Sequence, residues 1–434
     1  LEQVDDCCPE TLPNDLRIRH QLCELNFAIR QAHFPLNVEN LRLARRRLAF
    51  EQMLMYQAAL GLLRGHKADG TALPIPPDAP DKFWQTLPFP PTGAQKRVLE
   101  EIAADLRCDR AMSRLVQGDV GCGKTALAFG AIAMTCACGY QAAMMAPTEI
   151  LAEQHYHTLA PLLEELGVRC ALLTASTKAK TRRSVLEQLT AGEIDLAIGT
   201  HALLSPDISY QNLGLVVTDE QHRFGVNQRA ALGAKGEAPH LLVMSATPIP
   251  RTLALMIYGD LDISILDELP PGRTPVKTRC ITGKKRRDLY GFLDREIGAG
   301  RQVYIVCPAI EDTPDGGLNA VKTYYEDIAK ALLPDRRVGL MHGRLKPKEK
   351  AAVMEDFKAG RLDALVSTTV IEVGVDVPNA SVMVIENAER YGLSALHQLR
   401  GRVGRGAAES WCFLVSDNTG EAVQKRLKFL CSTT

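Results

Sequence analysis

The stretch GDVGCGKT, at residues 118–125, decides the fold class of this 434-residue chain. It matches the pattern G-x-x-x-x-G-K-[ST] of a phosphate-binding loop (P-loop), with an apolar run before it and a helix-forming run after it. Its glycines let backbone N–H groups close around phosphate oxygens, and the following helix adds the positive end of its dipole. Lys124 is placed to reach the β- and γ-phosphates of ATP, and the Thr125 hydroxyl to ligate Mg²⁺. The other residues predicted to form this ATP site are Gly118, Asp119, Gly121 and Gly123.

A second acidic motif, LVVTDE at residues 215–220, supplies the carboxylates that such a site needs. Asp219 ends an apolar run, so we expect it at the edge of a sheet, where it holds Mg²⁺ through water. Glu220 is then placed to orient or deprotonate the attacking water. An Asp-Glu pair after a strand is also a common helix cap. The P-loop about a hundred residues upstream favours the catalytic interpretation.

The third motif is QLRGRVGRG at residues 398–406, with three arginines and three glycines. Without a P-loop it would be interpreted as a basic, glycine-rich surface loop. With one, its arginines are suited to neutralise charge on the transferring γ-phosphoryl group from across a cleft. ATP would then lie between two domains, and its hydrolysis could open and close that cleft, which is how a motor works.

Short apolar runs alternate with helical stretches in two successive zones, which predicts α/β domains with parallel sheets. We expect two tandem RecA-like P-loop domains, at residues 83–268 and 269–434, after a helical segment and proline-rich linker at 1–82. The predicted strands of the first domain lie at 114–117, 141–146, 195–199, 213–219 and 240–245. Those of the second lie at 302–307, 337–342, 363–367, 381–386 and 411–415.

The composition excludes several classes of protein. No stretch approaches the about 20 unbroken apolar residues of a transmembrane helix, so we expect no membrane partner. With 51 basic and 51 acidic side chains, any nucleic acid must bind to local basic patches. The 12 cysteines show no metal-site spacing. They also show no disulfide framework, so we expect reduced thiols in the cytoplasm. The first residue is Leu1 and not Met, so we expect a piece of a longer protein.

Seven motifs in order carry a family resemblance: GDVGCGKT, APTEILAEQH, GTHAL, DEQHRFGVNQR, MSATPIPRTL, VSTTVIEVGVDVPNA and QLRGRVGRG. The set resembles the motor of superfamily 2 helicases, and within them the bacterial RecG branched-DNA helicases. The stretches at 219–229 and 244–278 are the most specific to RecG, and the resemblance covers about residues 20–430.

The resemblance implies roles for further residues. Gln95 resembles the residue that reads adenine, and Arg402 and Arg405 resemble arginine fingers. Nucleotide contacts from the second domain are implied for Gly374 and Asp376, and coupling of hydrolysis to domain movement for Gln221, His222, Ser245 and Thr247. Contacts to the DNA backbone are implied for Pro147, Thr148, Thr200, Thr368 and Thr369. Taken singly, such threonines would be interpreted as helix caps.

The resemblance also implies a function: a monomeric, bacterial, cytoplasmic enzyme that uses ATP and Mg²⁺ to move on duplex DNA and remodel branched DNA in recombination and repair. RecG proteins carry an N-terminal wedge domain and a C-terminal element after the motor, and this sequence matches neither. We therefore expect the motor portion.

Three alternatives stay open at this point. The transcription-repair coupling factor shares TPIPRTL and a similar P-loop, but it usually differs after the acidic pair. A nucleotide-regulated DNA-binding protein without turnover would have no use for Glu220, Arg402 and Arg405. A small-molecule P-loop kinase would not explain the second domain. Basic clusters at 42–47, 178–183 and 284–287 could face DNA or be solvated surface.

Overall fold

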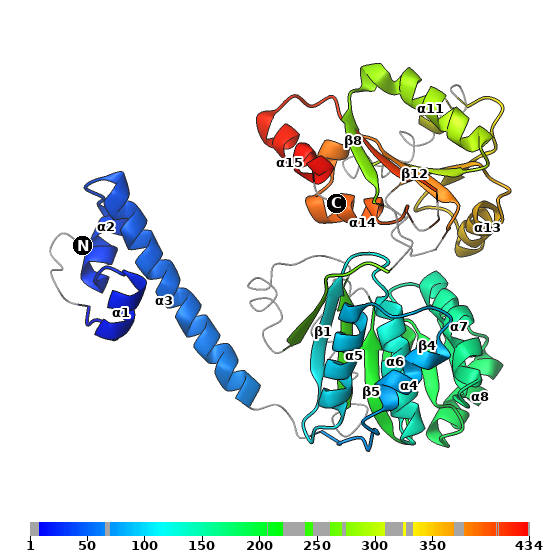
Figure 1. Ribbon diagram of the computed structural model, residues 1–434, viewed down its shortest axis with the longest axis horizontal. Helices are drawn as coiled ribbons and strands as arrows, with labels where there is room; N and C mark the ends of the chain where they lie inside the picture. Colours follow the sequence, from blue (N-terminus) through cyan, green and yellow to red (C-terminus); the bar gives the residue numbers. More distant parts are fainter. Residues whose placement is uncertain are drawn as a thin grey trace. The chain divides into compact units, whose positions relative to one another are not determined.

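The computed structural model describes residues 8–65, 70–205, 207–219, 239–245, 261–270, 275–308, 324–326, 333–368, 377–404, 406 and 408–432. The chain divides into two compact units. One holds residues 1–68 with 250–261, and the other holds residues 69–249 with 262–434. The second unit contains two parallel sheets, each covered by helices, which we call the first and second lobes (Figure 1).

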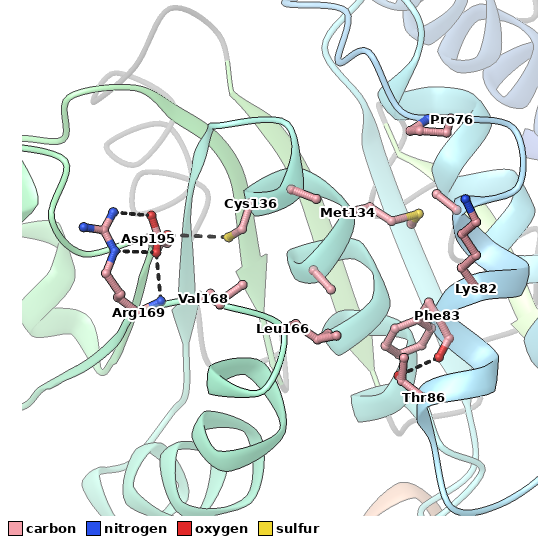
Figure 2. A pocket seen from close by; sticks show the side chains of 14 residues that line it. Pro76, Lys82, Phe83, Thr86, Met134, Cys136, Leu166, Val168, Arg169 and Asp195 are labelled. Atoms are coloured by element: carbon pink, nitrogen blue, oxygen red, sulfur yellow. Dashed lines mark hydrogen bonds and ion pairs between the residues drawn. The ribbon is translucent and has the colours of Figure 1, made fainter.

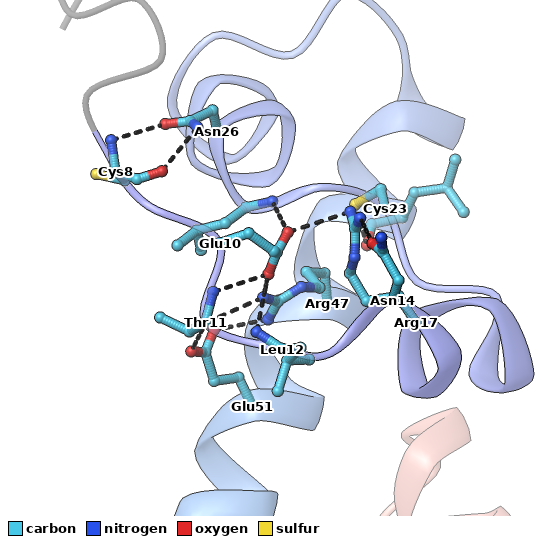
Figure 3. Close-up of polar contacts among 12 residues, drawn as sticks. Cys8, Glu10, Thr11, Leu12, Asn14, Arg17, Cys23, Asn26, Arg47 and Glu51 are labelled. Carbon is cyan, nitrogen blue, oxygen red and sulfur yellow. Dashed lines mark hydrogen bonds and ion pairs between the residues drawn. The ribbon is translucent and has the colours of Figure 1, made fainter.

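The first unit is helical, with α1 (Asn14–His20), α2 (Leu25–His33) and α3 (Val38–Gly65). A fully buried arginine of α3, Arg47, donates to Glu51 Oε2 at 2.6 Å and to Glu10 Oε1 at 2.5 Å (Figure 3). Glu10 also accepts the backbone N–H of Leu25 at 3.0 Å. This network ties the segment before α1 and the start of α2 to α3. Since its charge is neutralised inside the unit, Arg47 is not available to DNA phosphates.

The first lobe has a seven-stranded sheet in the order β3-β4-β2-β5-β6-β1-β7, with every pairing parallel. Its strands are β1 (Ser113–Gly118), β2 (Gln141–Met145), β3 (Cys170–Leu173), β4 (Leu196–Gly199), β5 (Leu213–Thr218), β6 (His240–Ser245) and β7 (Asp262–Leu266). Its helices are α4 (Ala79–Thr86), α5 (Gly93–Leu106), α6 (Lys124–Ala137), α7 (Glu149–Glu164), α8 (Ala179–Thr190) and the 3₁₀ turn η1 (His201–Leu204). Alternate residues of β2 enter opposite cores, Ala142 and Met144 one and Ala143 and Met145 the other.

The second lobe has a six-stranded parallel sheet in the order β10-β11-β9-β12-β13-β8. Its strands are β8 (Lys277–Ile281), β9 (Gln302–Val306), β10 (Val338–Met341), β11 (Ala364–Ser367), β12 (Ala380–Ile385) and β13 (Trp411–Val415). Its helical elements are η3 (Gly283–Lys285), α11 (Arg286–Gly298), α13 (Pro347–Lys358), η6 (Ala388–Arg390), α14 (Leu393–Arg400) and α15 (Glu421–Ser432). One core lies under α13, α14 and α15, and the other lies under α11.

Residues before the predicted first domain already pack into its core. Leu73 and Ile75 are buried in one core with Phe83 and Trp84 of α4 and the helices of the first lobe. The predicted boundary at residue 82 stays a prediction, while the packing begins near Leu73. Within the described ranges, no helix has the length and apolarity to cross a membrane.

Candidate active site

Parallel strands place most of the described candidate residues at one edge of the first sheet. The P-loop follows β1, Ser245 ends the neighbouring β6, and Asp219 follows β5, the next strand over. Pro147 and Thr200 come after β2 and β4, further along the same edge. Because the carboxyl ends of parallel strands form the usual ligand crevice of such folds, this edge is the candidate site.

The P-loop has the backbone that its glycines permit. Gly121 and Gly123 have φ angles of 82° and 91°, a region that L-residues rarely adopt. A Cβ on Gly123 would also lie 2.1 Å from Gln95 Nε2. The Lys124 ammonium lies within the loop and donates to the carbonyls of Gly118 at 2.7 Å and Asp119 at 2.8 Å. The positive φ angle and the lack of room for a Cβ therefore both require glycine at position 123.

Gln95 ties the P-loop to the start of α5 by hydrogen bonds. Its Oε1 accepts the Thr92 backbone N–H at 2.9 Å, and its Nε2 donates to the Cys122 carbonyl at 2.9 Å. The side chain is buried, and with Thr92 it forms a capping box at the start of α5. Its adenine-reading role stays a prediction, and the structure adds a contact with the P-loop.

Cys122 contributes more than backbone to the loop. Its side chain is fully buried in the core of the first lobe, and a Cβ on Gly118 would lie 2.7 Å from its Sγ. Burial raises the pKa of this thiol above its usual value. It is therefore a neutral packing group at neutral pH.

Asp219, the predicted Mg²⁺ carboxylate, is held by a histidine. Its Oδ2 lies 3.0 Å from Nε2 of His155 on α7, and its backbone N–H donates to the Met145 carbonyl at 2.9 Å. An ionised carboxylate can only accept hydrogen bonds, so His155 Nε2 carries the proton of this bond. The sequence shows His155 at the end of APTEILAEQH, but its spacing to Asp219 gives no signal of the contact.

The arginine motif of the second lobe reaches the P-loop of the first. His397 of α14 places its Nε2 3.0 Å from Oδ1 of Asp119. This hydrogen bond lowers the pKa of the Asp119 carboxyl, with burial opposing it and the charges of Lys124 and Arg400 adding to it. Arg402 lies two residues after the end of α14, in the motif that adjoins this contact.

The candidate DNA-contacting threonines that the structure describes have structural tasks as well. Thr148 Oγ1 caps α7 by accepting the Leu151 N–H at 3.4 Å, and Thr200 Oγ1 accepts the Ala202 N–H at 3.5 Å at the start of η1. Thr368 is buried at the end of β11. Contact with DNA stays a prediction for these residues and for Pro147, which precedes the cap of α7.

Several predicted residues lie outside the described ranges, and they stay predictions. They are Glu220, Gln221, His222, Thr247, Thr369, Gly374, Asp376 and Arg405. In the basic clusters, Arg182 pairs with Asp207 at 2.9 Å and Arg286 with the buried Glu386 at 2.7 Å. These two arginines thus have acidic partners inside the chain.

A groove of about 590 Å³ lies elsewhere on the first lobe (Figure 2). It is lined by Phe83 of α4, Met134 and Cys136 near the end of α6, and by Arg169 and Asp195, which precede β3 and β4. These strand starts form the amino edge of the sheet. The groove is therefore separate from the candidate nucleotide site at the carboxyl edge.

Comparison with known proteins agrees with this geometry. Residues 92–256 match the DEAD/DEAH box helicase model, and residues 284–407 match the helicase conserved C-terminal domain. The ATP-dependent DNA helicase RecG of Synechocystis sp. is 50% identical over 423 residues, covering 96% of this chain and 51% of that protein. That of Bacillus subtilis is 45% identical over 436 residues, covering 100% of this chain and 64% of that protein.

A solved structure of RecG bound to a three-way DNA junction superposes on the chain with a TM-score of 0.82 at 43% identity. It covers 98% of this chain and 57% of that one. Over nearly its whole length, the chain is thus similar to RecG helicases. It spans 51% and 64% of the length of the two RecG relatives above. The two family models and the RecG structure confirm the fold class expected from the sequence, two tandem RecA-like domains, while the domain bounds stay predictions.

Proposed function

We propose that this chain is the ATP-hydrolysing motor of a helicase that moves on duplex DNA and remodels branched DNA, such as four-way junctions and stalled forks. The observation that carries the proposal is the contact between the two lobes at the P-loop, where Asp119 meets His397. It brings the arginine motif next to the loop predicted to hold ATP phosphates. The names of the RecG relatives, ATP-dependent DNA helicases, support the same activity here.

In this proposal the chain's own residues divide the work of hydrolysis. P-loop amides and Lys124 bind the phosphates, and Glu220 orients or deprotonates the attacking water. Arg402 and Arg405 neutralise the charge of the transferring phosphoryl group from the second lobe. Thr125 and Asp219 offer the hard oxygen atoms that Mg²⁺ prefers, and the ion when bound neutralises phosphate oxygens.

The remaining implied roles belong to the same proposal. Gln95, Gly374 and Asp376 contact the nucleotide. The residues that couple turnover to lobe movement are Gln221, His222, Ser245 and Thr247, and those on the DNA backbone are Pro147, Thr148, Thr200, Thr368 and Thr369. Threonine hydroxyls suit this role, because they can bond phosphate without reading bases. We also propose a cytoplasmic monomer that acts in recombination and repair.

The test is ATP hydrolysis by this chain without DNA, with linear duplex and with a synthetic four-way junction. We expect DNA to stimulate hydrolysis strongly. We expect Lys124→Ala to abolish hydrolysis, because it removes the phosphate contact. More stimulation by the junction than by the duplex supports recognition of branches within these residues. Slow turnover that no DNA changes would contradict the proposed motor.

A further inference from the structure

A chain of hydrogen bonds runs from the end of α15 in the second lobe to the P-loop in the first. Arg400 donates to the Leu430 carbonyl at 3.0 Å and to His397 Nδ1 at 3.0 Å. His397 Nε2 in turn meets Asp119 Oδ1 at 3.0 Å. Neither His397 nor Arg400 is among the arginine fingers or phosphate-binding residues assigned above. We call Arg400, His397 and Asp119 the relay.

The chemistry of these groups fixes which atom donates and which accepts in each hydrogen bond of the relay. A guanidinium has only donors, so His397 Nδ1 must accept, and its proton must sit on Nε2. That N–H then donates to the Asp119 carboxylate. Leu430 lies in the last turn of α15, where carbonyls have no partner within the helix, and a cation there also complements the helix dipole. Each hydrogen bond of the relay therefore satisfies a group that needs one.

A second contact supports the same junction. A Cβ on Gly401, next to Arg400, would lie 2.7 Å from the Cβ of Val120 in the P-loop. The backbone of the arginine motif thus approaches the loop as closely as a glycine allows. Asp119 is half-exposed at 46% and His397 is 19% exposed, while Arg400 is buried. The bond between the lobes is the water-accessible part of the relay, and so the part that can break and reform.

We propose that His397, which Arg400 holds through Nδ1, is a positioning residue that sets the arginine motif against the P-loop. The proposal rests on the proposed ATPase function. Arg402 lies five residues after His397 and one after Gly401. Any shift of the end of α14 therefore moves Arg402 relative to the phosphates.

The variants His397→Gln and His397→Asn test whether turnover depends on the hydrogen bond to Asp119. Glutamine extends an N–H to about the position of Nε2 and should keep the bond to Asp119. Asparagine is too short to reach it. We expect His397→Asn and His397→Ala to lower kcat about tenfold, the size of one lost hydrogen bond to a charged group. His397→Gln should keep most of kcat, and KM for ATP should change little in all three.

A double-mutant cycle supplies the test that a purely structural role would fail. If the residues act through one bond, Asp119→Ala with His397→Ala should lose no more kcat than either change alone. His157→Ala, an exposed histidine on α7, is the matched control, and thermal unfolding checks that each variant folds. Independent losses that multiply, or a raised KM with unchanged kcat, would overturn the proposal.

A readout without ATP separates this proposal from the motor itself. We expect hydrogen exchange of the backbone at residues 397–401 to quicken in Asp119→Ala, and exchange at 119–123 to quicken in His397→Ala. If the unmodified chain hydrolysed no ATP but the two variants showed these changes, the motor would fail, while the contact between His397 and Asp119 would stand. Unchanged exchange in both variants would overturn the relay whatever the ATPase does.

Discussion

Two acidic side chains of the site, Asp119 and Asp219, are each held by a histidine donor. His397 orients the first and His155 the second, at 3.0 Å in both cases. Neither histidine has a spacing in the sequence that points to its partner, because each contact joins residues far apart in the chain. The acidic residues could be predicted from motifs, whereas their partners depend on how α7 and α14 pack.

His155 should matter for turnover through Asp219. His155→Leu removes a hydrogen bond to a charged carboxylate, worth about 1.5–3 kcal/mol, so we expect kcat to fall at least tenfold. More Mg²⁺ should also be needed for half-maximal rate, because the carboxylate is no longer oriented. His155→Gln keeps a donor and should retain most of the rate.

The measurement is ATP turnover against Mg²⁺ concentration. His157→Leu is the control on the same helix, since His157 is exposed. A His155→Leu variant that behaves like this control would show that Asp219 needs no such support.

At the scale of elements, the sequence predicts the interior of both sheets and one edge strand, β10, but misses the other three edge strands. All ten predicted strands are present, but β3, β7 and β8 were not predicted. Each of the three lies at the edge of its sheet. Edge strands are less buried, and the residues of β8 are all half-buried or exposed. β7 and β8 therefore lack the continuous apolar run by which a buried parallel strand is recognised, and the run in β3 is only four residues long.

The anchor of α3 gives a prediction at the same scale. The hydrogen bond from Thr11 and the contacts with Arg47 lower the pKa of Glu51 below its ordinary 4.5. A lowered pKa stabilises the fold above the ordinary value, and this stabilisation is lost as pH falls through the folded pKa. We expect the helical unit to unfold in acid, and Arg47→Met to weaken it by about 3 kcal/mol, because two carboxylates lose their partner.

Two spectroscopic signals separate this unit from the motor. Both tryptophans, Trp84 and Trp411, belong to the second unit, so their fluorescence reports on the lobes alone. Circular dichroism also detects the 28-residue helix α3. Arg47→Met should move an acid transition seen by circular dichroism to higher pH without moving the fluorescence. A fluorescence change of equal size would show that the two units unfold together.

At the scale of the whole molecule, the site is divided between two lobes that share one plan. The P-loop and Asp219 come from the first, and the arginine motif comes from the second, 280 residues after the P-loop begins. In the proposed mechanism, neither lobe holds all the groups that hydrolysis needs. Turnover should therefore depend on the second lobe far more than nucleotide binding does.

Arg402→Ala tests this division. If Arg402 acts on charge that develops only in the transition state, kcat should fall by ~10³-fold while the affinity for ATP changes little. Arg361→Ala, an exposed arginine of the second lobe that pairs with Asp356 at 2.7 Å, is the matched control. Turnover and affinity should be measured on the same preparations. Comparable losses of both would place Arg402 on the phosphates of bound ATP before reaction, and the second lobe would then bind nucleotide instead of sensing its hydrolysis.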